Sequence, residues 1–368
     1  MVQDQTRPDE IASTPPVQGK RRSRLGLFLP YILLAVVAVG WSAGWFWIRG
    51  RAAGEIDAWI AREAAAGRTW TCADRTLGGY PFRIELRCSA VTLERADGQF
   101  RLGPSTAVAQ IYQPRLVVFE SAGPFHVEQG DLVGDAAWKG LQGSFHGAAE
   151  GFARASLVVD NPDITVNGAE PGPIAVTGRH LELHARPTPG RYDSEGAVDV
   201  SLRLTQAAVP QLDALTGTRD PADLALDATL TQATVLRTGT VARELERWRQ
   251  AGGTLDLTAL SLAKGDQRVQ AKGTLALDAA HRPAGQIDLR AAGVDALVGS
   301  IVGQRFGSDR GALVGQLVGG LLGLSRRPDA EAPTGSAPLK ALPPLRLVDG
   351  RLVFSGFPIP NVFVPALY

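Results

Sequence analysis

The hydrophobic residues of this chain follow two successive patterns. From Leu25 to Ile48 they form a run of 24 residues that contains no charged side chain. From about Trp70 onward, apolar and polar residues alternate with a period of two in many short segments. A strand with that period has one apolar and one polar face, which is typical of antiparallel sheets. The second pattern therefore predicts a mainly β body (α+β) of curved antiparallel sheets with a few short covering helices.

Turn residues locate individual strands within the alternating region. Two alternating runs, 91–93 and 100–102, flank Asp97-Gly98, a dipeptide that favours two-residue hairpin turns. Asp349-Gly350 has the same place between two alternating runs near the C-terminus. Further strands are expected at 115–119, 155–159, 174–185, 198–204, 224–230, 254–262, 268–277 and 285–291.

The uncharged run is long enough to cross a membrane. As a helix it would extend about 36 Å, which exceeds a hydrocarbon core of about 30 Å. Basic residues precede it, namely Lys20, Arg21, Arg22 and Arg24. Because such an excess favours the cytoplasmic side, the N-terminus is predicted inside the cell, with Trp41, Trp45 and Trp47 at the far membrane interface. A cleaved signal peptide is the alternative, but its apolar core would be only about 7–15 residues long.

These patterns divide the chain into four segments. They are a disordered cytoplasmic tail (1–19), a transmembrane anchor (20–49), a juxtamembrane helix (50–68) and a periplasmic β-rich body (69–368). The juxtamembrane helix is predicted because Ile56, Trp59 and Ile60 are spaced as one helix face. Gly67 is placed to end that helix. Two short helices are expected within the body, at 209–215 and 241–250.

Residues 293–324 combine a row of glycines with an apolar ridge. A break at Ser308-Asp309-Arg310 predicts two short helices, 293–306 and 310–324, neither long enough to span a bilayer. The residues concerned are Gly299, Gly303, Gly307, Gly311, Gly315, Gly319, Gly323, Leu313, Leu317 and Leu321. We expect this segment either to plug and cover the apolar sheet face or to act as a retractable lid beside a lipid cavity. A proline-rich loop is expected at 325–344.

Charge and cysteine content narrow the function classes. Lys and Arg total 38 and Asp and Glu total 37, a net charge of +1. Such a chain lacks the positive field of a non-specific nucleic-acid binder, so no nucleic-acid partner is expected. Cys72 and Cys88 are expected to form a disulfide because an exported chain meets an oxidising compartment. A redox or metal pair is the alternative, although the spacing is neither Cys-x-x-Cys nor a zinc pattern.

The sequence holds no recognisable catalytic or cofactor-binding motif. It lacks nucleotide-binding glycine loops, a nucleophile elbow and the zinc-protease helix motif. His180 and His184 share a strand face and suit either a metal pair or, as we expect, a solvated pair, with Glu182 on the opposite face. We therefore expect no enzyme activity, no cofactor and no metal. A hydrolase whose site is assembled from distant residues is the alternative.

Several short motifs follow the anchor in a distinctive order. They are Gly79-Tyr80-Pro81-Phe82-Arg83 leading to Cys88, Gln110-Ile111-Tyr112-Gln113-Pro114-Arg115, His281-Arg282-Pro283-Ala284-Gly285-Gln286-Ile287 and Leu345-Arg346-Leu347-Val348-Asp349-Gly350-Arg351. In this order, from about residue 25 to the C-terminus, the chain resembles the bacterial domain-of-unknown-function family DUF2125. The resemblance implies a single-pass envelope protein of Gram-negative bacteria and assigns no catalytic residue.

A remoter resemblance concerns one strand pair near the C-terminus. Gly273-Thr274-Leu275-Ala276-Leu277-Asp278, followed by Arg282-Pro283-Ala284-Gly285, is similar to strand pairs of AsmA-type envelope proteins, whose β-rich region forms an apolar groove for lipids. We therefore expect an inner-membrane protein, in contact with the lipid bilayer, that binds or passes a lipid or another apolar envelope component. A structural or assembly factor that binds envelope proteins is the alternative.

Overall fold

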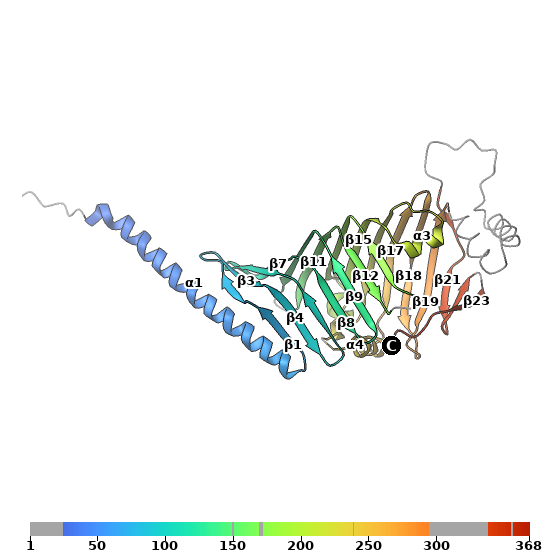
Figure 1. The fold of residues 1–368 in the computed structure, drawn as a ribbon, viewed down its shortest axis with the longest axis horizontal. Helices are drawn as coiled ribbons and strands as arrows, with labels where there is room; N and C mark the ends of the chain where they lie inside the picture. Colours follow the sequence, from blue (N-terminus) through green and yellow to red (C-terminus); the bar gives the residue numbers. More distant parts are fainter. Residues whose placement is uncertain (1–24, 149–150, 169–171, 238, 294–337, 355) are drawn as a thin grey trace, which may run out of the picture. The chain divides into compact units, whose positions relative to one another are not determined.

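The computed structural model describes most of the chain (Figure 1). The described residues are 25–148, 151–168, 172–237, 239–293, 338–354 and 356–368. They belong to two compact units, Met1–Ile48 and Arg49–Tyr368. The predicted cytoplasmic tail and the glycine-rich segment from Gly299 to Gly323, with its three leucines, lie outside the described residues.

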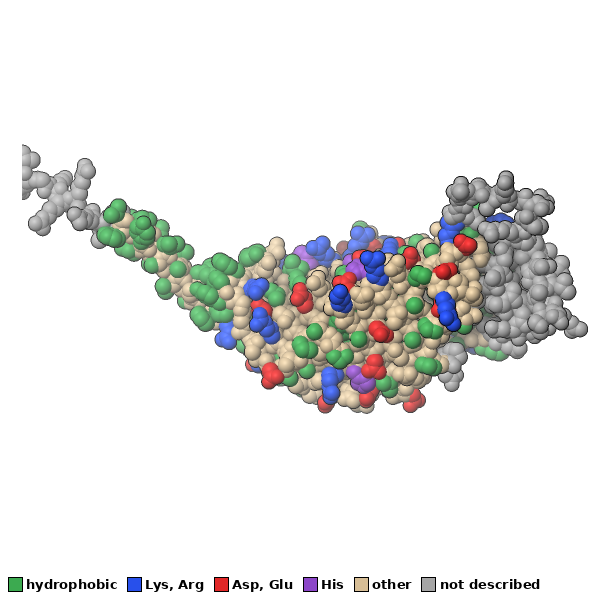
Figure 2. Space-filling model, turned by 45° about the horizontal axis from the view of Figure 1, so that its top comes forward, with side chains coloured by type: hydrophobic (Ala, Val, Ile, Leu, Met, Phe, Trp, Pro, Cys, Tyr) green, Lys and Arg blue, Asp and Glu red, His purple; other side chains and the backbone are tan. Residues whose placement is uncertain are grey.

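A single helix, α1 (Leu25–Ala65), begins in the first unit and ends in the second. Within the described part of the chain it is the one helix long and apolar enough to cross a membrane. Figure 2 shows hydrophobic side chains along its first part. The predicted anchor and juxtamembrane helix are therefore one continuous helix. Gly67 follows its end with a positive φ of 78°, as predicted, because a left-handed residue closes a helix.

The second part of α1 is fixed to the body by polar and aromatic contacts. Arg49 Nε donates a hydrogen bond of 2.9 Å to the backbone oxygen of Leu77. Asp57 pairs with Arg75 at 2.7 Å. These contacts fix the beginning of the second unit to its first strands.

The body consists of two antiparallel sheets, neither of which closes on itself. Within the described residues the smaller sheet has seven strands, in the spatial order β1 (Thr69–Ala73), β4 (Ala90–Arg95), β5 (Gly98–Leu102), β8 (Phe125–Gln129), β9 (Leu132–Ala137), β12 (Asp163–Asn167) and β13 (Ile174–Thr177). The larger sheet, of sixteen described strands, has the order β2 (Thr76–Gly78), β3 (Arg83–Cys88), β6 (Ser105–Gln110), β7 (Gln113–Ser121), β10 (Gly140–Gly147), β11 (Phe152–Asp160), β14 (His180–Pro187), β15 (Val198–Ala207), β16 (Ala222–Leu230), β17 (Leu255–Lys264), β18 (Gln267–Leu277), β19 (Pro283–Ala292), β21 (Leu345–Val348), β22 (Arg351–Phe354) and β23 (Phe357–Phe363), with β20 (Lys340–Ala341) also paired to β19.

Successive hairpins enter the two sheets alternately as far as β13. β2–β3, β6–β7 and β10–β11 lie in the larger sheet, whereas β4–β5, β8–β9 and β12–β13 lie in the smaller one. The chain crosses between the sheets in short segments, which we call the spine: Ser89, Gly103-Pro104, Ala122–Pro124, Trp138-Lys139, Asn161-Pro162 and Gly178-Arg179. Neighbouring crossings are hydrogen-bonded to each other, as from Gly103 N to Pro124 O at 3.0 Å. The sheets are therefore joined along one line, as the two layers in Figure 1 show.

One predicted strand is wrong, because a crossing of the spine divides it. The region 174–185 is not one strand but two, β13 and β14, which belong to different sheets. Gly178 and Arg179 cross between them, and Gly178 N donates to the oxygen of Pro162 in the neighbouring crossing. A crossing of two residues interrupts the alternation so little that it resembles a bulge within one strand.

The described helices of the body are short. They are α2 (Tyr192–Glu195), α3 (Pro210–Thr216), the 3₁₀ turn η1 (Ala233–Val235) and α4 (Val241–Gln250). Thr240 caps α4 by accepting a hydrogen bond from Arg243 N, and the buried Trp248 donates its indole N–H to Thr231 O at 2.7 Å. The two helices predicted within the described body are thus confirmed, with α3 shifted by one residue.

Candidate functional site

A disulfide shows which faces of the two sheets are turned toward each other. Cys72 lies on β1 of the smaller sheet and Cys88 on β3 of the larger one, and the two are bonded, as predicted. A short covalent bridge requires that the faces bearing these two side chains face each other. We call these the inner faces of the sheets.

Both inner faces are apolar. In the smaller sheet, the residues in cross-strand register with Cys72 are Val91, Leu102, Phe125, Ala136, Ile164 and Val176. In the larger sheet, one row crosses eleven strands without a polar side chain: Leu86, Ala107, Phe119, Gly143, Leu157, Leu183, Leu202, Leu226, Leu260, Ala271 and Leu289. We call these eleven residues the inner row. At about 4.8 Å between strands, the inner row extends about 48 Å.

The inner row is not packed like a closed core. Of its eleven members only Gly143 and Ala271 are buried, and every larger side chain keeps part of its surface accessible. Leu183, in the middle of the row, is 36% exposed. Apolar side chains between two fully packed sheets are normally shielded from solvent. The inner face therefore offers an apolar surface that the described protein covers only partly.

Aromatic rings line the inner face next to α1. Trp70 on β1 lies 5.4 Å from Trp59 of α1 and 5.3 Å from Phe100 on β5, measured between ring centroids. Phe100 in turn lies 5.7 Å from Phe125. This row of rings forms an apolar wall at the end of the inner face that is nearest to the helix.

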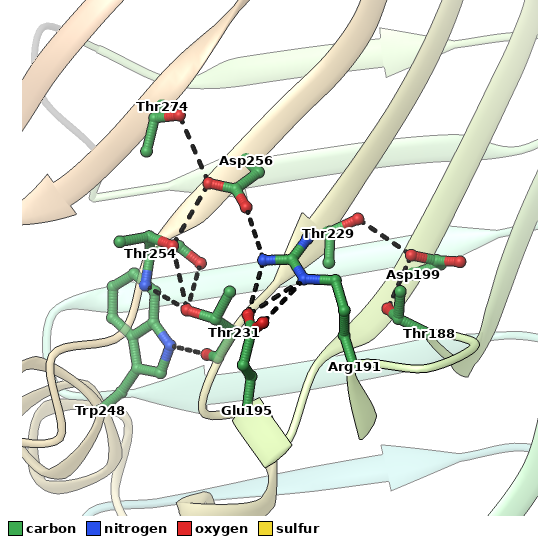
Figure 3. Close-up of polar contacts among 10 residues, drawn as sticks. All are labelled: Thr188, Arg191, Glu195, Asp199, Thr229, Thr231, Trp248, Thr254, Asp256 and Thr274. Carbon is green, nitrogen blue, oxygen red and sulfur yellow. Dashed lines mark hydrogen bonds and ion pairs between the residues drawn. The ribbon is translucent and has the colours of Figure 1, made fainter. Parts of the chain in front are cut away.

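The opposite, outer face of the larger sheet is polar and carries several ion pairs. Figure 3 shows Arg191 beside Glu195 and Asp256. One guanidinium nitrogen of Arg191 lies 2.6 Å from a carboxylate oxygen of Glu195 and 3.3 Å from one of Asp256. Asp199 accepts hydrogen bonds from Thr188 and Thr229, at 2.7 and 2.9 Å. On the face of the body seen in Figure 2, charged side chains of both signs are scattered rather than gathered by sign.

A hollow of about 780 Å³ lies on this outer face. Its carboxylates are Asp199 and Asp227. Arg203, bonded to both oxygens of Asp227 at 2.8 and 3.0 Å, lowers the pKa of that carboxyl. Burial by itself raises the pKa of Asp199, but hydrogen bonds from Thr188 and other donors bring it below its ordinary value. Both carboxylates are thus held ionised, which suits ion pairing and does not suit a general acid near neutral pH.

The predicted histidine pair lies on the outer face, and one part of that prediction is wrong. Glu182 does not point to the opposite face: it bonds to His180 at 2.9 Å and to His184 at 3.4 Å. Strand residues two apart share a face, so the three side chains are neighbours. Hydrogen bonds to Asp160 and Glu182 raise the pKa of His180. Among the described residues no group of three or more His, Cys, Asp or Glu is arranged to hold a metal ion.

A second histidine repeats this arrangement on the smaller sheet. His126 lies 2.7 Å from Asp135, its cross-strand neighbour, and 3.0 Å from Glu128, two residues along β8. These bonds, led by that to Asp135, raise the pKa of His126. The sequence offered no signal for this cluster, because the aspartate comes from the facing strand.

The other residues selected from the sequence have varied positions. Trp41 and Trp47 are exposed on α1 and Trp45 is buried, and their place at a membrane interface stays a prediction. The inner row was not identified from the sequence as a unit. Its members alternate with polar residues as expected, but only the register between strands shows that they form one continuous surface.

These features define a class of protein: a β-rich body of two spine-joined sheets that follows a single apolar N-terminal helix. The chain belongs to the DUF2125 family, described as "Uncharacterized protein conserved in bacteria", whose family model matches residues 45–362. The expected family is thereby confirmed. Neither the curated proteins nor the solved structures contain a match to this chain.

Proposed function

We propose that this protein is a non-enzymatic, membrane-anchored carrier that binds acyl chains of a lipid, or another apolar envelope component, on its inner face. The supporting observation is the inner row, which crosses eleven strands without a polar side chain and stays partly accessible. Each CH₂ group removed from water contributes about 0.8 kcal/mol of favourable free energy. An acyl chain that covers this surface is therefore stabilised by the burial of many such groups.

The dimensions of the inner row suit a lipid. One leaflet of a bilayer contributes about half of a hydrocarbon core of about 30 Å, so the chains of one lipid reach about 15 Å. The inner row, at about 48 Å, is about three times as long. The row therefore has room for a bound lipid to move along it, or for more than one lipid.

The proposed location is the inner membrane, with the N-terminus in the cytoplasm and the body in the periplasm. Basic residues before the apolar run and three tryptophans near its end support this orientation. The disulfide between Cys72 and Cys88 supports an oxidising compartment for the body. A body in the periplasm next to the membrane has direct access to envelope lipids.

Mass spectrometry of the body tests this function. The segment from Arg49 to Tyr368, exported to the periplasm and purified without detergent, should retain a phospholipid or fatty acid in near-stoichiometric amount. A folded body without any lipid would contradict the carrier function and favour an assembly factor that binds envelope proteins. Omitting detergent matters because detergent would itself occupy an apolar face.

A further inference from the structure

Two turns with exposed aromatic side chains lie side by side at the β2 end of the larger sheet. The first contains Tyr80 and Phe82, between β2 and β3, and the second contains Tyr112, between β6 and β7. Strands β3 and β6 are paired, and Ile111 N donates a hydrogen bond of 3.1 Å to Phe82 O. The three aromatic side chains are 54%, 59% and 66% exposed. We call Tyr80, Phe82 and Tyr112 the aromatic tip.

The aromatic tip lies a few residues from a contact made by Arg49, where the second unit begins. Arg49 is the first residue after the uncharged run, and its Nε donates to Leu77 O on β2 at 2.9 Å. Tyr80 follows Leu77 by only three residues, a chain length of about 10 Å at most. If the apolar run spans a bilayer, the aromatic tip is therefore within reach of the headgroups of the leaflet at which the run ends.

The chemistry of the aromatic tip suits a lipid surface. Tyrosine and phenylalanine favour the membrane interface, and neighbouring cations favour anionic headgroups. Arg115 is exposed and follows Tyr112 by three residues, whereas Arg83, next to Phe82, is paired with Glu85 at 3.1 Å.

The apolar inner face extends almost to the aromatic tip. Ile84 begins a second inner-face row, which continues through Ala109 and Val117. Ile84 follows Phe82 by two residues, and Ala109 precedes Ile111 by two. A lipid chain leaving the bilayer at the aromatic tip would therefore meet the inner face two residues from Phe82 on one strand and three residues from Tyr112 on the other.

We propose that the aromatic tip docks on the bilayer, and that lipid chains pass over it between the bilayer and the inner face. The second part rests on the proposed lipid-carrying function, whereas docking does not. The partner in both parts is the lipid bilayer itself, with anionic phospholipid favoured by Arg115.

Photocrosslinking from the full chain tests the docking. The chain is reconstituted in vesicles of phosphatidylethanolamine and phosphatidylglycerol with p-benzoyl-phenylalanine in place of Tyr112 or, as the control, of Phe363. Phe363 is also aromatic and 70% exposed, but β23 lies twelve strand positions from β6 in the larger sheet. We expect several-fold more lipid adduct at position 112 than at position 363. Equal adducts, or none at position 112, would overturn the docking.

A third photoreactive position separates docking from lipid carriage. The same probe in place of Leu183 reports lipid on the inner face. Exchanging Tyr80, Phe82 and Tyr112 together for serine should lower the adduct at position 183 several-fold, whereas Phe363→Ser should not. An unchanged adduct would overturn passage over the aromatic tip. No adduct at position 183 in the unaltered chain would contradict lipid carriage and leave the docking result at position 112 valid.

Discussion

Lys264 and Asp213 form an ion pair that joins the end of β17 to helix α3. Lys264 Nζ lies 2.6 Å from Asp213 Oδ1, and the lysine side chain is only 2% exposed. The same ammonium group also donates to the backbone oxygen of Asp220. A buried lysine is tolerated only when such partners compensate for its lost hydration. The pair therefore fixes α3 to the larger sheet.

Replacing this lysine should destabilise the body strongly. Lys264→Met leaves the Asp213 carboxylate without its cation, and we expect the free energy of unfolding to fall by about 3 kcal/mol. Urea denaturation followed by circular dichroism measures the change. Arg186→Met is the matched control: Arg186 is exposed, and Asp199 keeps Thr188 and Thr229, so a loss below about 1 kcal/mol is expected. Equal losses in the two variants would contradict this account of Lys264.

The disulfide should stabilise the junction of the two sheets. Cys72 and Cys88 are 16 residues apart, and replacing both by serine should lower the free energy of unfolding by about 3 kcal/mol in the chain-entropy description. Adding a reductant to the unaltered protein should reproduce the loss in a denaturation curve. The reductant should not change the stability of the double variant. If it also leaves the stability of the unaltered protein unchanged, the prediction is wrong.

The stability of the body should fall as the pH rises from about 6 to about 8. His126 and His180 have raised pKa values in the folded state because each donates to two carboxylates. The largest effect comes from Asp135 on His126 and from Asp160 on His180. A raised folded pKa gives stabilisation that is complete below the unfolded value of about 6.5 and is lost as the pH rises through the folded value. Urea midpoints across this range measure the effect.

Variants assign that pH dependence to the two histidines. His126→Gln and His180→Gln together should flatten the curve between about pH 6 and about pH 8. The partner carboxyls Glu128 and Glu182 do not titrate there, since hydrogen bonds from His126 and His180 lower their pKa values. A slope that persists unchanged in the double variant would show that other groups cause it.

Lipid retention should distinguish the inner face from the outer face. Leu183→Asn places an amide in the inner row and should lower the lipid recovered per protein several-fold, as measured by mass spectrometry. Val118→Asn is the matched control, because Val118 has a similar exposure of 39% but points to the outer face, between the inner-face residues Val117 and Phe119. Equal retention in the two variants would argue against a lipid on the inner face.

Elements governed by local sequence were predictable. The turn at Asp349-Gly350 was expected from the dipeptide, and both residues have the positive φ values, 51° and 70°, that it favours. Helix α4 lies where predicted, because a charged, amphipathic sequence marks it. The disulfide followed from the compartment and from the presence of only two cysteines.

Relationships between distant strands were not predictable. The alternation of residues 198–204 predicts a strand with an apolar face, yet it does not reveal which strands stand on either side. The two-residue crossings that send alternate hairpins to different sheets resemble bulges in the sequence. The inner row and the cluster of His126 with Asp135 both arise from pairing between strands, so neither was visible beforehand.

Because the two sheets are joined along the spine, the length of the body can change without a change in its width. From β2 to β13 each step along the spine adds one hairpin to each sheet, and each hairpin contacts mainly its immediate neighbours, as units do in solenoid proteins. Insertion or loss of one such pair of hairpins would lengthen or shorten the apolar inner face by about 10 Å and leave its width unchanged. The architecture is thus extensible, and relatives with longer or shorter bodies need no new fold.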